Sequence, residues 1–423
     1  MVYYGLLLFF ALEYIRPSSY FPALNAFHLN SLVPLAVLFG SVFTKKVKMP
    51  DVLGSPSAHW IMFLLFLLVI SGLICDVKMY AITVFEMVLG YFFMFIVLKK
   101  EIYDLDRVKG LFTTLILVHL AVGALTPEMF SGDGERHYIA TGAFLGDGND
   151  FALSVNIAIP LCLFMISESQ GVIRKLFYTG MLAVLIIAVV QTQSRGGIVA
   201  LACVALFYWA KNDRKIIGVI GMVLVLFLIV AVAPPQFYER MQTMTKTGDE
   251  MEGSAAGRIA VWGASLRMVA DHPITGVGAG HFPVKYGVEY RPEGVGSSDI
   301  PWQTAHSSYF LILGELGIPG IIFLFGIMLS NFIAGERMSR EMKARRTERD
   351  VTCRNLVIAL NASMVAFAIG GAFLSAPYYP HIYMLAALLE CGRQLCKEAI
   401  ASEAVVRSPQ EGRPLVFRGA SVQ

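Results

Sequence analysis

Residues 58–75 read AHWIMFLLFLLVISGLIC and residues 79–98 read MYAITVFEMVLGYFFMFIVL, with only Asp76, Val77 and Lys78 between them. An α-helix needs about 20 consecutive apolar residues to cross the hydrocarbon core of a bilayer, and both runs are close to that length. Because the connection is so short, the second helix must return beside the first. The pair predicts a transmembrane hairpin, and the rest of the chain repeats the pattern.

Apolar runs of this kind recur along the whole chain. Apolar residues make up 56% of the 423 residues and charged residues only 15%, and the mean hydropathy is +0.63, which excludes an ordinary soluble domain. We therefore predict an all-α, polytopic membrane protein with about 12 transmembrane helices. The runs cover residues 2–14, 29–43, 58–75, 79–98, 108–124, 150–167, 175–192, 196–210, 215–233, 307–333, 354–374 and 377–396.

The placement of lysine and arginine predicts the orientation. With the N-terminus inside, every inner connection carries lysine or arginine, and most of the 34 basic residues fall on that side, as the positive-inside rule requires. Both termini are then cytoplasmic. The start lacks a basic n-region and a small-residue cleavage site, which favours a retained helix over a signal peptide. The net charge of +3 reflects these topological signals and does not indicate nucleic-acid binding.

The runs divide the chain into four regions. Residues 1–233 hold the first nine helices, 234–305 form a large outer loop, 306–396 hold the last three helices, and 397–423 form a cytoplasmic tail. The composition of the tail predicts disorder. The six cysteines fall in or beside apolar runs without a C-x-x-C pair. We interpret them as small buried residues, not as disulfides or metal ligands.

The connection from Thr126 to Asn149 is rich in glycine and acidic residues and contains Arg136 and His137. Glycine, aspartate and asparagine favour turns and a helix cap, so one interpretation is a solvated loop. The alternative is a lip over a substrate cleft, with Arg136 and His137 facing it. The spacing of the acids does not fit an EF-hand calcium loop.

The outer loop 234–305 contains a helix of its own. Apolar residues recur at offsets of three and four, at Ile259, Trp262, Leu266 and Val269, which places them on one helical face. Beside a bilayer, such an amphipathic helix lies flat at the interface, a level that suits tryptophan. Arg258, one turn earlier, would then lie at the edge of a cleft. The glycine-rich stretch 276–280 forms either a plain turn or a backbone that approaches phosphate.

Three stretches carry a family resemblance: Ser194-Arg195-Gly196-Gly197, the segment from Gly257-Arg258-Ile259-Ala260-Val261-Trp262 to Gly278, and the segment from Ala305-His306-Ser307-Ser308 to Gly320. In order, spacing and placement they resemble the O-antigen ligase and O-antigen polymerase superfamily of bacterial membrane glycosyltransferases. The resemblance extends from the eighth apolar run through the tenth.

The resemblance implies a GT-C-like fold in the bacterial inner membrane and a periplasmic active site. It implies a polyprenyl-pyrophosphate-linked glycan as donor, a lipid-core, glycan or protein hydroxyl as acceptor, and neither a metal nor a cofactor. By the same resemblance, Arg195 and Arg258 bind the donor pyrophosphate, and His306 is the catalytic residue that serves the acceptor. Ligase and polymerase differ only in the acceptor, and the sequence does not separate them.

The chemistry of these residue types suits that reaction. Arginine binds phosphate oxygens through forked, charge-assisted hydrogen bonds that lysine cannot reproduce, and histidine is the side chain most easily used as a base near pH 7. A metal-dependent enzyme would need an outward acidic pair instead. The sequence Asp104-Leu105-Asp106 has the D-x-D pattern, but it falls in an inner connection, so we predict no metal.

Each of these residues also has a structural interpretation. Arg195 could snorkel from a helix end, Arg258 could pair with a loop acid such as Asp249 or Glu252, and His306 could cap the helix that follows. Three further residues are possible supporting groups. Glu315 is too costly to face lipid and either orients a site residue or only forms structural hydrogen bonds, while Tyr378 and Tyr379 belong to an aromatic belt or stack on sugar.

A transporter or flippase is the competing class. Glu86, His119 and Glu315 are ionisable residues within apolar runs and could form a proton path. Against that reading, the two halves of the chain show no repeat, and the loop 234–305 is long and rich in motifs. We therefore predict a glycosyltransferase.

Overall fold

The computed structural model of the chain describes residues 1–130, 143–213, 215–242, 253–291, 303–345 and 347–407. Throughout this part of the chain the regular structure is helical, and no strand is present. The helices are α1 (Val2–Ile15), α2 (Pro17–Tyr20), α3 (Leu29–Val42), α4 (Met49–Leu53), α5 (Pro56–Ile74), α6 (Lys78–Glu101), α7 (Leu105–Leu125), α8 (Gly148–Glu168), α9 (Val172–Gln191), α10 (Arg195–Lys211), α11 (Lys215–Val232), α12 (Pro235–Gln242), α13 (Gly253–Asp271), α14 (Phe282–Val288), α15 (Ser308–Arg345), α16 (Glu348–Gly371) and α17 (Pro380–Arg407), with short 3-10 turns η1 (Pro22–Phe27), η2 (Pro127–Phe130) and η3 (Ala143–Leu145).

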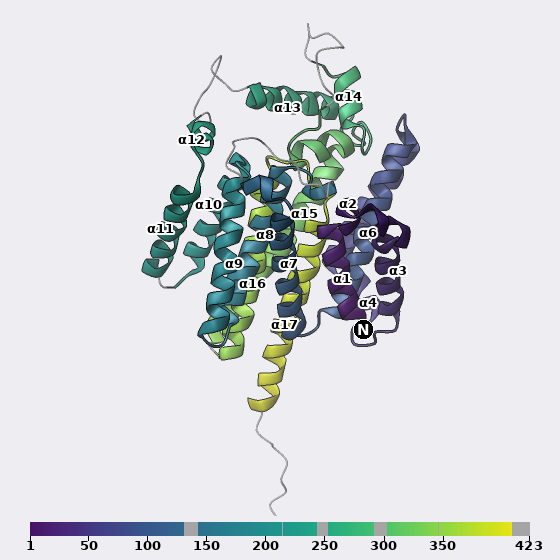
Figure 1. Cartoon of the computed structure of the whole chain (residues 1–423). Coiled ribbons are helices and arrows are strands. Elements are labelled where there is room, and N and C mark those ends of the chain that lie inside the picture. Colours follow the sequence, from purple (N-terminus) through teal and green to yellow (C-terminus); the bar gives the residue numbers. More distant parts are fainter. Residues whose placement is uncertain (131–142, 214, 243–252, 292–302, 346, 408–423) are drawn as a thin grey trace, which may run out of the picture.

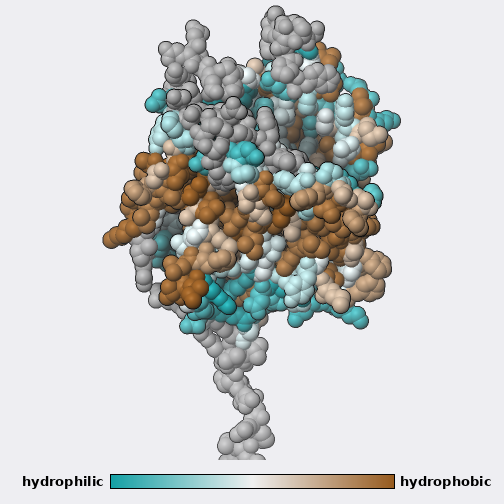
Figure 2. Space-filling model, in the orientation of Figure 1, coloured by the Kyte–Doolittle hydropathy of each residue, from teal (hydrophilic) through white to brown (hydrophobic). Residues whose placement is uncertain are grey.

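The long helices form one bundle with an apolar girdle (Figures 1 and 2). The centre of the bundle is formed by α8 and α16. In the apolar segment of α8, 83% of the residues are buried, and in that of α16, 72% are buried. A helix that is apolar all round belongs in an interior, whereas a helix with one apolar stripe covers it. At the periphery, α11 leaves Ile220, Leu224 and Phe227 exposed. The girdle of exposed apolar side chains matches a lipid-facing surface.

Eight described helical segments are long and apolar enough to cross a membrane. They are Pro22–Val42, Pro56–Ile74, Lys78–Glu101, Leu105–Leu125, Gly148–Glu168, Val172–Gln191, Ser308–Arg345 and Glu348–Gly371. Each apolar run of the sequence coincides with a helix, which confirms the all-α, multi-pass architecture. The runs at α1, α10, α11 and α17 are also helical but fall outside those eight, so the count of about twelve crossings stays a prediction.

The two ends of the bundle differ. One end, here called the cap end, carries α12, α13 and α14, and α13 lies across the direction of the long helices (Figure 1). The opposite end, here called the basic end, holds the start of α1 and the end of α17 (Figure 1). The sequence-predicted loop 234–305 thus supplies the helices of the cap end.

The last helix is longer than the sequence predicted. We expected disorder over 397–423, but α17 continues to Arg407, so residues 397–407 are helical. The physical reason is a small apolar cluster at the basic end, where Cys396 and Ala399 pack on Met338, Met342 and Val357. Burial of these side chains stabilises an extra length of helix. Residues 408–423 of the predicted tail lie outside the described residues.

Helix α15 is broken near the cap end. Gly317 has φ 65° and ψ −156°, which interrupts the helical backbone, and Pro319 has no N–H with which to continue the ladder. The Glu315 carbonyl, which a non-proline residue 319 would satisfy, instead accepts a hydrogen bond of 3.0 Å from Gly278 N–H. Likewise Val277 N–H donates to the Gly314 carbonyl at 2.9 Å, and Ile318 N–H donates to the Pro273 carbonyl at 2.8 Å.

The segment 273–278 is therefore paired with the break in α15. Close approach of the two backbones requires glycine: a Cβ at Gly276 would lie 2.3 Å from the Glu315 carbonyl carbon, and a Cβ at Gly317 would lie 2.5 Å from the Pro273 oxygen. Both glycines also have positive φ, a conformation that other residues adopt at a cost. The cap end is thus fixed to the bundle through main-chain hydrogen bonds.

Candidate functional site

Helix α13 docks on the first turns of α15 through Trp262, and we call this contact the Trp262 seat. The Trp262 indole N–H donates to the Ala305 carbonyl at 3.0 Å, and its ring stacks on Phe310 with centroids 5.0 Å apart. Ser265 also donates to the Phe310 carbonyl, at 2.6 Å. Arg258 and Trp262 are four residues apart and therefore lie on the same side of α13. The seat thus directs the Arg258 side of the helix toward the segment that contains His306.

The seat also fixes which face of α13 is buried. Val261, Ala264 and Met268 are fully buried, while Ile259 and Leu266 are 55% and 52% exposed. Of the face predicted from the sequence, Ile259 and Leu266 are therefore turned away from the bundle, whereas Trp262 packs on α15. Val261, Ala264 and Met268 are also three and four residues apart, so the spacing alone does not show which apolar face of α13 is buried.

His306 lies directly before α15 in a left-handed backbone conformation, with φ 47°. A non-glycine residue in that region is uncommon and persists where its surroundings hold it. Its surroundings are well fixed: Thr304 donates to Ser375 at 2.9 Å, and Ser308 donates to the Leu374 carbonyl at 2.7 Å. His306 itself is half-buried. The histidine is therefore held between α13 and the connection 372–379 that joins α16 to α17.

Arg195 is the first residue of α10 and is half-buried. Ser194 caps the helix by accepting a hydrogen bond from Gly197 N–H at 3.1 Å, and the Asn156 amide of α8 donates to the Gly197 carbonyl at 3.0 Å. A Cβ at Gly196 would lie 2.8 Å from Phe373. The glycines of the Ser194–Gly197 motif therefore allow the start of α10 to pack against α8 and against the connection 372–379.

The connection 372–379 joins the parts of the site. Its Phe373 packs beside Arg195 at Gly196, and its Leu374 and Ser375 accept hydrogen bonds from the segment on either side of His306. Through the Trp262 seat, the same segment meets α13 one turn from Arg258. The three sequence-predicted residues thus belong to one contact network at the cap end.

Glu315 is buried on α15 and accepts hydrogen bonds from two other segments. Tyr378 donates to its Oε2 at 2.9 Å, and Phe282 N–H donates to its Oε1 at 3.2 Å. Glu315 therefore connects α15, the glycine-rich stretch and the connection 372–379. Its partners are neutral donors, not His306 or an arginine, which favours the second of the two roles considered from the sequence.

The glycine-rich stretch 276–280 donates its N–H groups to the protein itself. Gly276 N–H donates to the His272 carbonyl, Val277 and Gly278 to the break in α15, and Ala279 to Ser71 Oγ at 2.7 Å. These donors are consequently occupied, and the stretch serves as a docking segment for the cap end. The plain-turn interpretation of the glycines fits these contacts, whereas a phosphate-binding backbone would need the same donors.

The remaining predicted residues are placed as follows. Tyr379 donates to the Asp150 carboxylate at 3.0 Å, so both tyrosines of the connection 372–379 bind buried or half-buried carboxylates. Arg136 and His137 lie outside the described residues. His119 hydrogen bonds to Ser154 and to the Leu115 carbonyl, both at 2.6 Å, and Glu86 is exposed on α6. Within the described residues, no hydrogen bond joins Glu86, His119 and Glu315 into a path.

Sequence reasoning missed several polar residues that hold the site together. Asn156 and Ser154 lie inside the apolar helix α8 and are fully buried; Asn156 binds the start of α10, and Ser154 hydrogen bonds to both His119 and His381. A polar side chain inside an apolar run is itself a signal, because burying it without a partner is costly. That signal was present at residues 154 and 156.

Comparison with known proteins agrees with the motifs. Residues 180–325 match the sequence model of the O-antigen ligase family, which confirms the resemblance to that family. The matched segment begins in α9 and ends after the break in α15, so it contains Arg195, Arg258, Trp262, His306 and Glu315. No curated protein matches the chain. Together with the apolar helices, the family match identifies a multi-pass membrane protein with an O-antigen ligase-type domain.

Proposed function

We propose that this protein is a membrane glycosyltransferase that moves a glycan from a polyprenyl-pyrophosphate donor to an acceptor hydroxyl at the periplasmic face of the inner membrane. Arg195 and Arg258 bind the pyrophosphate, and His306 accepts the proton of the attacking hydroxyl. One observation carries the proposal: the Trp262 seat and the connection 372–379 bring the surroundings of all three residues together. The family match over 180–325 supports the reaction type.

The reaction breaks the bond between the anomeric carbon and the pyrophosphate and forms a bond to the acceptor oxygen. Negative charge grows on the departing pyrophosphate, so fixed cations near it lower the barrier. Two guanidinium groups suit this role because each can donate two parallel hydrogen bonds to phosphate oxygens. Because pyrophosphate leaves readily as an anion, protonation of the leaving group by an acid is not required.

The acceptor hydroxyl must lose a proton as it attacks. The imidazole of His306 accepts that proton. Because His306 lies between two anchored segments, its position relative to the hydroxyl is restricted. Glu315, Tyr378 and Trp262 support the geometry by holding α13, α15 and the connection 372–379 in place. In this assignment their role is positioning.

The direct test is transfer by purified protein in detergent. The donor is a polyprenyl-pyrophosphate-linked glycan, and parallel reactions contain either a lipid-core acceptor or a second lipid-linked glycan. We expect product without nucleotide sugar and in the presence of EDTA, and the productive acceptor distinguishes ligase from polymerase. Loss of activity with EDTA and its return with magnesium or manganese would overturn the metal-independent mechanism.

The membrane side of the site needs a separate test. In a variant lacking the six native cysteines, single cysteines replace Ala270 on α13 and Lys343 on α15, both of which are exposed. An impermeant thiol reagent should label position 270 and not position 343 in cells with a permeabilised outer membrane. The reverse pattern would place Arg195 and Arg258 in the cytoplasm and exclude a periplasmic site.

A further inference from the structure

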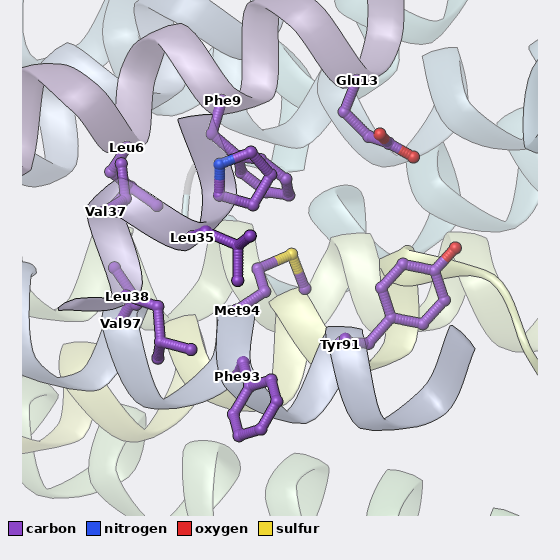
Figure 3. A pocket seen from close by; sticks show the side chains of 12 residues that line it. Leu6, Phe9, Glu13, Leu35, Val37, Leu38, Tyr91, Phe93, Met94 and Val97 are labelled. Atoms are coloured by element: carbon purple, nitrogen blue, oxygen red, sulfur yellow. The ribbon is translucent and has the colours of Figure 1, made fainter. Parts of the chain in front are cut away.

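An apolar groove lies between α1, α3 and α6, apart from the residues of the candidate site. It has a cavity volume of about 270 Å³. One end is lined by aliphatic side chains, and Glu13 and Tyr91 lie together at the other end (Figure 3). Leu6, Val37, Leu38 and Val97 form the aliphatic end. A long groove with one polar end is a shape that fits an amphiphile rather than a compact polar molecule.

The groove is open toward the outside of the bundle. Two of its lining side chains, Leu35 and Phe93, are 62% and 38% exposed, within a helix pair that belongs to the apolar girdle. Gly90 also lines the groove, and a Cβ added there would meet nothing within 4 Å. A hydrocarbon chain can therefore enter from the surrounding lipid, and the bare backbone at Gly90 leaves room for it.

The polar end of the groove leads toward the candidate site. Tyr91 stacks on Tyr383 of α17 with ring centroids 5.5 Å apart, and the Tyr383 hydroxyl donates to the Pro377 carbonyl at 3.2 Å. Pro377 belongs to the connection 372–379, which also holds the segment around His306. The groove and the site are thus connected through α17 and this connection.

We infer that this groove binds part of the isoprenoid chain of the lipid-linked donor; the inference rests on the proposed function. Ordinary ligand pockets have volumes of about 300–1,000 Å³, so this groove holds a segment of a long chain and not a whole lipid. The Glu13 carboxylate lies at the polar end and pairs with Arg16 at 3.0 Å. The contacts that lead from Tyr91 through Tyr383 to Pro377 join this end of the groove to the candidate site, which favours the donor over a bulk phospholipid as the occupant. An isoprenoid chain continues past Glu13, so its pyrophosphate can lie elsewhere, at the arginines.

Photo-crosslinking tests the groove without requiring transfer. Purified protein in detergent is irradiated with a benzophenone-bearing polyprenyl phosphate, and the labelled peptides are identified by mass spectrometry. We expect labels on α1, α3 or α6 that unlabelled undecaprenyl phosphate removes and that phosphatidylglycerol does not. Labels confined to other helices, or equal competition by phosphatidylglycerol, would overturn the inference.

Kinetics with Gly90→Leu provides the second readout. The leucine fills the groove, so KM for a long-chain donor should rise about tenfold while KM for a short-chain donor with the same glycan stays the same. Gly180→Leu on α9 is the matched control, because a Cβ there also meets nothing within 4 Å and the residue lies outside the groove.

An unchanged long-chain KM in folded Gly90→Leu protein would refute the groove. Specific labelling in a protein that transfers no glycan would refute the proposed function and leave the groove in place.

Discussion

Two buried carboxylates, one at each end of the bundle, are stabilised in different ways. At the basic end, Glu390 pairs with the Lys99 ammonium at 3.0 Å and accepts a hydrogen bond from Ser57 N–H at 2.9 Å. Toward the cap end, Glu315 accepts hydrogen bonds from the Tyr378 hydroxyl and from Phe282 N–H. One carboxylate is neutralised by a cation, and the other is solvated by neutral donors.

The difference shows how each end is built. At the basic end, ion pairs join neighbouring helices, as Arg107 does with Glu101 at 2.7 Å and Lys109 with Glu168 at 3.3 Å. At the cap end, main-chain hydrogen bonds and tyrosines hold the segments around the break in α15, and the buried Glu315 is bound by Tyr378 and Phe282 N–H. We therefore expect the two ends to respond differently to substitution.

The largest expected effect is at His306. His306→Asn removes the base, and asparagine tolerates the left-handed backbone better than most residues, so the protein should fold normally. We expect kcat to fall by about 10²–10⁴, the contribution of a general base, with donor affinity nearly unchanged. The control is His272→Asn, an exposed histidine of the cap end. Normal turnover by folded His306→Asn protein would exclude His306 as the base.

Substitution of the arginines should have the next largest effect. Arg195→Ala or Arg258→Ala should lower transfer by about 10²–10³, the scale of one preorganised electrostatic group, and should weaken donor binding. Lysine at either position should restore little activity, because a point charge cannot donate two parallel hydrogen bonds. Arg267→Ala on the same helix is the control, since Arg267 donates to the Tyr290 carbonyl at 2.9 Å. Equal losses in Arg258→Ala and Arg267→Ala would indicate a structural role for Arg258.

A smaller effect is expected where the cap end docks on α15. Gly276→Ala should separate the two backbones, because its Cβ would lie 2.3 Å from the Glu315 carbonyl carbon. We expect about a tenfold loss of transfer, equivalent to about 1.4 kcal/mol of lost positioning, and a lower unfolding temperature. Gly263→Ala on α13 is the matched control, because its Cβ would meet only Arg267, at 3.8 Å. If both variants behave alike, the pairing of 273–278 with α15 does not position the site.

The smallest effect on transfer is expected at the basic end. Glu390→Gln leaves Lys99 largely buried without its counter-charge, which should destabilise the protein by about 3–5 kcal/mol, while kcat of the folded protein stays unchanged. Lys343→Ala provides the control, because the exposed pair of Lys343 with Asp213 should contribute only about 0–1 kcal/mol. The two readouts are thermal unfolding in detergent and initial rates. A large fall in kcat for Glu390→Gln would show that the two ends are coupled.

The helices could be predicted from the sequence because length and apolar character constrain them strongly. The run 79–98 became α6 (Lys78–Glu101), and the run 150–167 became α8 (Gly148–Glu168). The greater length of α15 and α17 was not predicted, because it depends on contacts between these two helices. Met338 of α15 and Ala399 of α17 belong to one apolar cluster. Such contacts join residues far apart in the chain, and local patterns do not report them.

The candidate site was predictable as a set of residues, whereas its support was not. The motifs directed attention to Arg195, Arg258 and His306, and the structure brings their surroundings together. The pairing of Gly278 with Glu315 could not be foreseen, because a glycine-rich stretch and a Gly-Ile-Pro-Gly segment each look like an ordinary turn or kink when considered separately. Their roles become visible only when the donor missing at Pro319 is matched with the donor available at Gly278.

The break in α15 also constrains how the protein can be assembled during synthesis. The carbonyls of Gly314 and Glu315 obtain their donors from residues 277 and 278, which leave the ribosome earlier than α15 does. The cap end must therefore wait, undocked, until α15 has inserted, and only then can either partner complete its hydrogen bonds. Residues 273–278 and 314–318 should therefore be exchanged together. A chimera between relatives whose junction lies between 278 and 314 takes the two sides of this pairing from different parents.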